Sequence, residues 1–100
     1  MDMKRERDFM DLISALNSIG KRAFVKYYFD FKNKSIDACL ASFEENYTHQ
    51  GKYTRVVNAK RIFRENLQIQ ALEIISGADR VDEGTKTKAK TLLSLERSTI

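Results

Sequence analysis

The stretch RAFVKYYFDFK, residues 22–32, decides the fold class of this 100-residue chain. Its apolar residues fit one face of a helix through Phe24, Val25, Tyr28 and Phe31. They fit an alternating β-strand equally well through Val25, Tyr27, Phe29 and Phe31. A lone strand leaves its backbone hydrogen bonds unmade, and the nearest second candidate, residues 53–57, is short. We therefore predict a helix over residues 22–32, with a strand as the open alternative.

The rest of the chain favours helices as well. It contains no proline and only four glycines, whereas all-β domains need frequent turn residues. The apolar share of 42% is enough for a globular interior. We predict an all-α fold, a compact bundle of five or six short helices, in a single domain over residues 1–100.

The first helix has the clearest pattern and is expected over residues 4–18. Apolar residues recur there at three- and four-residue spacing, namely Phe9, Leu12, Ile13, Leu16 and Ile19. Gly20 follows the last of them, where a left-handed C-cap favours a residue without Cβ. The second helix, residues 22–32, comes directly after this glycine.

Capping residues place the remaining helices. Ser35 is the expected N-cap of a third helix and Asp82 that of the last, which should fray after about Arg97. Residues 47–52 are expected to form a loop, with Thr54 as the N-cap of the next helix. The apolar pattern slips near Asn66, which predicts a break before a helix at residues 68–76; one continuous helix is the alternative.

The sequence offers little material for catalysis. His49 is the only histidine and Cys39 the only cysteine, and we expect an exposed loop residue and a buried thiol rather than a reactive pair. No catalytic residue, metal ligand set, cofactor or small-molecule ligand is predicted, so the protein is expected not to be an enzyme. With one cysteine, and without a leader peptide or a membrane-spanning stretch, we expect a cytoplasmic protein that does not bind membranes.

The aromatic cluster within residues 22–32 is one candidate site. Half of the ten aromatic residues lie there, namely Phe24, Tyr27, Tyr28, Phe29 and Phe31. On a helix they would surround most of its circumference, and one core face cannot cover them all. We therefore predict that they form a partner interface, with a centrally packed helix as the alternative.

The second candidate is a basic patch on the helix predicted to begin at Thr54. Residues 52–66 carry five basic side chains and one acidic side chain, while residues 35–51 carry three acidic and no basic ones. The five basic residues are Lys52, Arg55, Lys60, Arg61 and Arg64. Such a patch could neutralise several phosphates, or it could be a solvated face paired with the acidic segment.

These features lead to two expected functions. The first is a non-enzymatic binding or regulatory protein that acts through protein–protein contact and forms a homodimer through the aromatic cluster. The alternative is a DNA-binding regulator that uses the basic patch. A helix-turn-helix over residues 68–95 is disfavoured, because Asp82 and Glu83 would face the phosphates.

Overall fold

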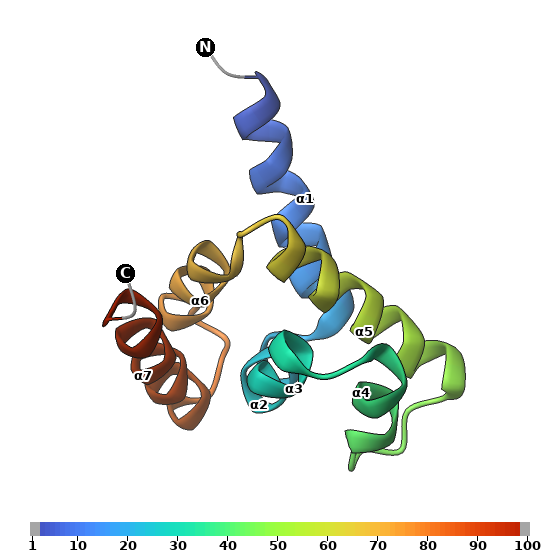
Figure 1. Ribbon diagram of the computed structural model, residues 1–100. Helices are drawn as coiled ribbons and strands as arrows, with labels where there is room; N and C mark the ends of the chain where they lie inside the picture. The colour runs from blue at the N-terminus through green and yellow to red at the C-terminus, as the bar shows by residue number, and fades with distance from the viewer. Residues whose placement is uncertain (1–2, 99–100) are drawn as a thin grey trace.

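The computed structural model describes residues 3–98, with side chains described for residues 11–98. Over this range the chain forms seven helices and no strand. They are α1 (Met3–Ile19), α2 (Lys21–Lys26), α3 (Tyr28–Asn33), α4 (Ile36–Ser42), α5 (His49–Arg64), α6 (Gln68–Ser76) and α7 (Glu83–Ser98), as Figure 1 shows. The predicted all-α bundle of short helices is confirmed, with one helix more than expected.

The extra helix arises within residues 22–32. This stretch is helical, as predicted, and the strand alternative is wrong. It breaks at Tyr27, whose backbone (φ −107°, ψ 24°) ends α2 and begins α3. Hydrogen bonds run on through the break, from the N–H of Tyr27 to the carbonyl of Ala23 and from the N–H of Phe31 to that of Tyr27. Two short helices therefore replace the single predicted one, and their side chains need not follow one helical period.

Three predicted helix boundaries are confirmed. The Ser35 hydroxyl accepts a hydrogen bond from the N–H of Ala38 at 3.2 Å and caps α4. The Asp82 carboxylate accepts from both the N–H and the hydroxyl of Thr85, at 2.9 and 2.8 Å, at the start of α7. Asn66 has a positive φ of 59° and interrupts the helix between α5 and α6, so the continuous helix is excluded.

The predicted start of α5 is wrong. Thr48, not Thr54, is the N-cap, and its hydroxyl accepts from the N–H of Gly51 at 3.0 Å. Most of the predicted loop at residues 47–52 is therefore the first turn of a longer helix. This shift matters for function because it places Tyr53 on the surface of α5.

A glycine follows α1, as predicted, and another follows α6. Gly20 has a φ of +89° between α1 and α2, a conformation that side chains with a Cβ rarely adopt. Gly77 directly follows α6 and donates its N–H to the carbonyl of Glu73. The first predicted helix is also present as α1, although the side chain of Phe9 lies outside the described residues.

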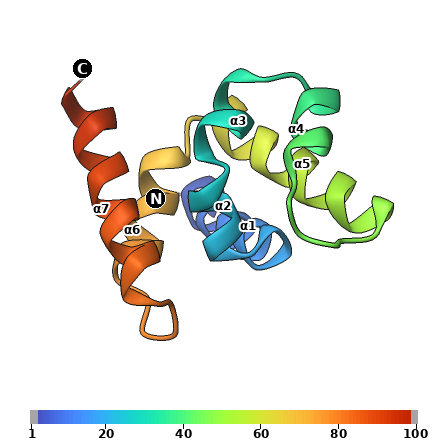
Figure 2. The ribbon, with the colours of Figure 1, turned by 90° about the horizontal axis from the view of Figure 1, so that it is seen from below.

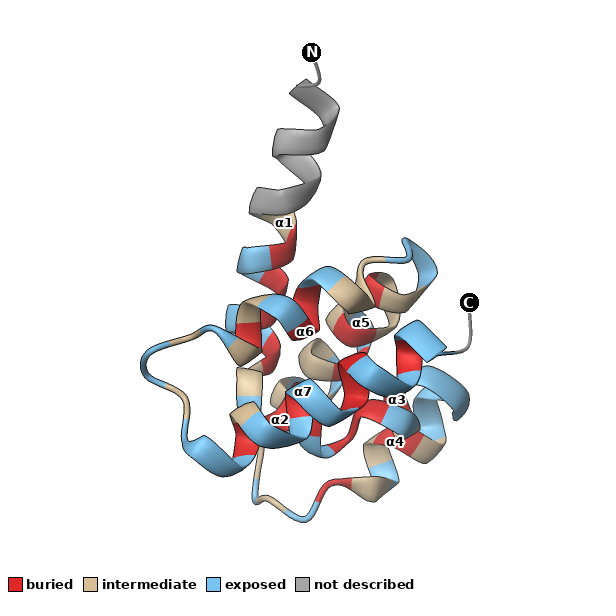
Figure 3. Ribbon diagram, turned by 90° about the vertical axis from the view of Figure 1, so that its left-hand side faces the viewer, coloured by how far each residue is buried: buried red, intermediate tan, exposed pale blue. Residues whose placement is uncertain are grey.

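All seven helices contribute to one hydrophobic core. Its largest fully buried side chains are Tyr28, Phe24 and Phe31. α6 packs mainly against α7, and α1 packs mainly against α5. Figure 3 shows that buried segments lie where the helices face one another, while the outer faces are exposed. The core therefore lies between these two helix pairs, with α2 and α3 inserted into it.

Candidate interaction surfaces

Most of the predicted aromatic interface belongs to this core. Phe24, Tyr28 and Phe31 are at most 1% exposed and Tyr27 is 6% exposed, whereas Phe29 is 49% exposed. The expectation that one core cannot cover the cluster is wrong for four of the five residues. The break at Tyr27 lets rings point in several directions, and α4, α5 and α7 cover them. Only Phe29 remains exposed enough for a partner to reach.

The polar end of Tyr27 also has a structural role. Its hydroxyl donates to a carboxylate oxygen of Glu45 at 2.6 Å and accepts from the backbone N–H of Glu44 at 2.9 Å. Lys26 forms ion pairs with both glutamates, at 3.0 and 2.9 Å. The hydrogen bond from Tyr27 and the charge of Lys26 lower the pKa of Glu45 to about 2. This network ties α2 to the segment that follows α4.

The predicted basic patch is divided among different environments. The guanidinium of Arg55 lies 3.7 Å from the centre of the Tyr47 ring and donates to the carbonyl of Gly51 at 3.1 Å. Lys52 is half-buried. Lys60 donates through its Nζ to the carbonyl of Lys34, while Arg64 is exposed. Arg55 and Lys60 therefore already contact groups within the protein.

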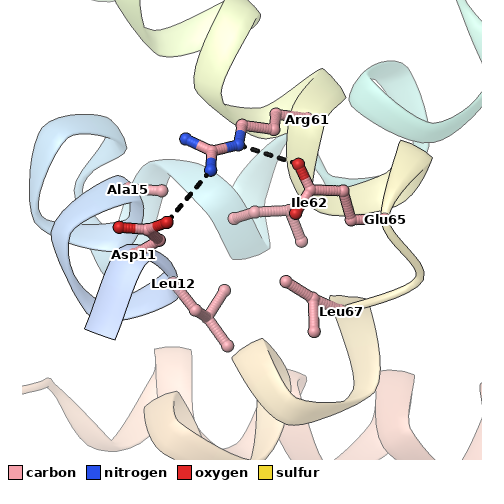
Figure 4. A pocket seen from close by; sticks show the side chains of 7 residues that line it. All are labelled: Asp11, Leu12, Ala15, Arg61, Ile62, Glu65 and Leu67. Carbon is pink, nitrogen blue, oxygen red and sulfur yellow. Dashed lines mark hydrogen bonds and ion pairs between the residues drawn. The ribbon is translucent and has the colours of Figure 1, made fainter. Parts of the chain in front are cut away.

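Arg61 is occupied by carboxylates, as Figure 4 shows. Its Nε lies 2.9 Å from Glu65 and its Nη2 lies 3.3 Å from Asp11 of α1. Both carboxylates raise the pKa of the guanidinium, and the hydrogen bond with Glu65 has the largest effect. The cavity beside these side chains measures only ≈ 10 Å³, which is room for about one water molecule. The ion pair between Arg61 and Asp11 therefore joins α5 to α1, and the pocket beside it is too small to hold a ligand.

The longer α5 presents an exposed stripe that the sequence analysis did not identify. Tyr53 is 46% and Val57 39% exposed, and they are followed along the helix by Lys60 and Arg64. At 100° per residue, the 4-3-4 spacing puts these four side chains within about 60° of one another over about 16 Å. We call this stripe the α5 face. Prediction of an N-cap at Thr48 would have revealed it, because Tyr53 then belongs to the helix.

The start of α4 adds to this surface. The hydrogen bond from Lys60 to the carbonyl of Lys34 brings the N-terminal end of α4 close to α5. Ile36, in the first turn of α4, is 40% exposed. Three of the large hydrophobic residues that are exposed in the described part of the chain thus belong to α4 and α5.

The two residues considered for catalysis, Cys39 and His49, lie in different environments. Cys39 is 1% exposed, its Sγ lies 3.1 Å from the carbonyl oxygen of Asp30, and burial raises the pKa of its thiol. His49 is the exposed first residue of α5. Within the described residues, no three His, Cys, Asp or Glu side chains gather so as to hold a metal ion.

Comparisons of the chain with protein-family models, with curated proteins and with solved structures found no match. None of the described helices combines the length and the apolar character needed to cross a membrane. The function of this chain must therefore be inferred from its own exposed side chains.

Proposed function

We propose that this chain is a non-enzymatic binding protein and that its α5 face contacts an acidic, amphipathic helical segment of a partner protein. The observation that carries the proposal is the stripe of Tyr53, Val57, Lys60 and Arg64. Its apolar half offers an aromatic ring and a β-branched side chain, as helix-in-groove contacts do. Its cationic half favours carboxylates over like charges.

Charge supports a partner that differs from this chain. In a contact between two copies, neither α5 face offers a carboxylate to Lys60 and Arg64 of the other, and with parallel α5 helices these cations would lie together and repel each other. A homodimer through the predicted aromatic cluster has little support, because four of its five residues are buried. The remaining ring, Phe29, covers far less than the roughly 800 Å² per partner of a standard interface. A distinct acidic protein is therefore the better occupant.

The partner is sought with a photo-crosslinking residue at Val57, in the cells from which the chain comes. We expect acidic segments of one or a few proteins to be captured. The same residue at Thr87, exposed on α7, is the positional control. Capture should be lost in the variant Lys60→Glu, Arg64→Glu and kept in Lys90→Glu, and circular dichroism should show that both remain helical. Equal capture from Thr87, or capture of only a second copy of this chain, would refute the acidic partner.

Nucleic-acid binding is the second candidate function, supported by the exposed Tyr53 ring on the same side of α5 as two cations. Such a ring can stack on a base while cations contact the backbone. Only Lys60 and Arg64 share the α5 face, so at most two phosphates would be neutralised there. On duplex DNA this predicts a slope of log K against log salt of about −1.8. Fluorescence anisotropy over a salt series measures the slope: a value near about −1.8 would support nucleic-acid binding by the α5 face, whereas no binding at low salt, or a much steeper slope, would refute it.

The cytoplasm remains the proposed compartment. The only cysteine of the sequence cannot form an internal disulfide, and a thiol of this kind suits a reducing environment.

A further inference from the structure

A cationic groove lies between the turn that joins α1 to α2 and the loop that joins α6 to α7. Its larger part is a cavity of ≈ 420 Å³ lined by Lys21, Arg22 and Arg80. A second cavity of ≈ 250 Å³ also has Arg22 in its lining, together with Lys88 of α7. Figure 2 shows the α6–α7 loop where it returns to the start of α7. The two cavities share Arg22 and Asp82, so segments far apart in the sequence build one groove.

Four cations of the groove are available to a ligand. These cations are Lys21, Arg22, Arg80 and Lys88. Within the described range 11–98, they form no ion pair or hydrogen bond with other side chains. In contrast, Arg61 and Arg97 each reach a carboxylate. Positive charges gathered in one groove repel each other unless an anion lies between them. The groove is therefore a place where an anion would relieve repulsion.

Asp82 is the one carboxylate that lines both cavities, and it is already engaged. Its two oxygens accept the N–H and the hydroxyl of Thr85 and so cap α7. Arg22 is close enough to contribute to the lowered pKa of Asp82, although the two form no ion pair. The groove thus has four cations around one carboxylate, each oxygen of which already accepts a hydrogen bond from Thr85.

We propose that this groove binds a phosphomonoester, either a small phosphorylated molecule or a phosphorylated lipid headgroup. Two arginines favour a phosphate, because a guanidinium can donate two parallel hydrogen bonds to its oxygens. The walls also include Leu16, Ala78 and Val81, which can contact an apolar part of the ligand. A volume of ≈ 420 Å³ exceeds what one phosphate fills and lies within the usual range of about 300–1,000 Å³ for small-molecule sites.

The test titrates the isotope-labelled full chain with phenyl phosphate, followed by amide chemical shifts in NMR spectra. We expect saturable shifts at Gly20, Lys21 and residues 80–82. Benzoate, which carries the ring but only one negative charge, should bind more weakly. Shifts that fail to saturate, or equal binding of benzoate, would overturn the phosphate site.

Variants separate a built site from general charge attraction. Arg22→Gln and Arg80→Gln should each weaken binding of phenyl phosphate about tenfold, whereas Lys90→Gln, an equal charge change outside the groove, should not. Asp82→Asn keeps a capping oxygen but removes the opposing charge, so it should strengthen binding severalfold. An equal loss in Lys90→Gln, or weaker binding in Asp82→Asn, would refute the groove.

The source of the phosphate is distinguished by a vesicle experiment. Cosedimentation with vesicles that contain phosphatidic acid, lost in Arg80→Gln, would identify a lipid headgroup. Binding of phenyl phosphate without cosedimentation would identify a soluble phosphorylated molecule. Absence of both would overturn the proposal.

Discussion

Replacing Glu96 by alanine is expected to lower the free energy of unfolding by about 2–3 kcal/mol. Glu96 is 8% exposed on α7 and accepts hydrogen bonds from the Tyr28 hydroxyl and, at 2.7 Å, from Lys32 of α3. Tyr28 is 1% exposed, so its hydroxyl would lose its partner inside the core, which costs about 1–3 kcal/mol. The side chain of Lys32 is 35% exposed and can rotate into solvent, so loss of its ion pair with Glu96 adds only about 0.5 kcal/mol.

Thermal and urea unfolding measure this effect. The midpoint temperature should fall by about 10–20 °C, since a domain of this size loses about 4–8 °C per kcal/mol. The matched control is Glu73→Ala, which removes an exposed ion pair with Arg97 and should cost less than about 0.5 kcal/mol. Glu96→Ala and Tyr28→Phe should also be non-additive in a double-mutant cycle. Equal costs for Glu96→Ala and Glu73→Ala would refute the view that the buried carboxylate joins α3 to α7.

Four further predictions concern the same kind of contact. Tyr27→Phe should cost about 1–2 kcal/mol in urea unfolding, because the N–H of Glu44 and the carboxylate of Glu45 both lose the hydroxyl. Acid should destabilise the fold, because Glu45 has a pKa of about 2 in the folded chain and about 4.3 when unfolded. Its contribution to the free energy of unfolding is present above about pH 4.3 and is lost as the pH falls towards about 2. Thermal unfolding at each pH measures this loss. Burial raises the pKa of Glu96, but hydrogen bonds from Lys32 and Tyr28 outweigh it and lower the pKa overall, so Glu96→Gln should reduce this acid sensitivity. Asp82→Ala should lower the midpoint temperature of unfolding by loss of the α7 cap, while Asp82→Asn should lower it much less, and equal thermal shifts would contradict the cap.

Local signals in the sequence predicted the helices well where one residue decides the boundary. Ser35 and Asp82 satisfy the first N–H groups of α4 and α7 by contacts three residues away, which a sequence shows directly. Thr48 was missed because the residues after it, beginning with His49, are polar and show no apolar period. The apolar pattern starts later, and so Thr54 was the better candidate.

The candidate sites were harder to predict because they depend on contacts between distant residues. Arg61 looked like part of a basic patch, but its carboxylate partner Asp11 lies 50 residues away. Tyr28 looked like surplus surface, but Glu96, 68 residues away, accepts its hydroxyl inside the protein. Residue types and spacing reveal a charge or a ring, whereas its availability to a partner is decided by tertiary packing.

The two proposed sites use different elements, and this makes them separable by experiment. The α5 face consists of Tyr53, Val57, Lys60 and Arg64, whereas the groove is built around Arg22 and Arg80, and no residue is shared. Mutations at distant sites without shared partners usually act independently. We therefore expect Lys60→Glu, Arg64→Glu to abolish crosslinking at Val57 and leave binding of phenyl phosphate unchanged, and Arg80→Gln to do the reverse. If either variant impairs both activities while the helical content is unchanged, the two surfaces are coupled and the phosphate would act as a regulator of partner binding.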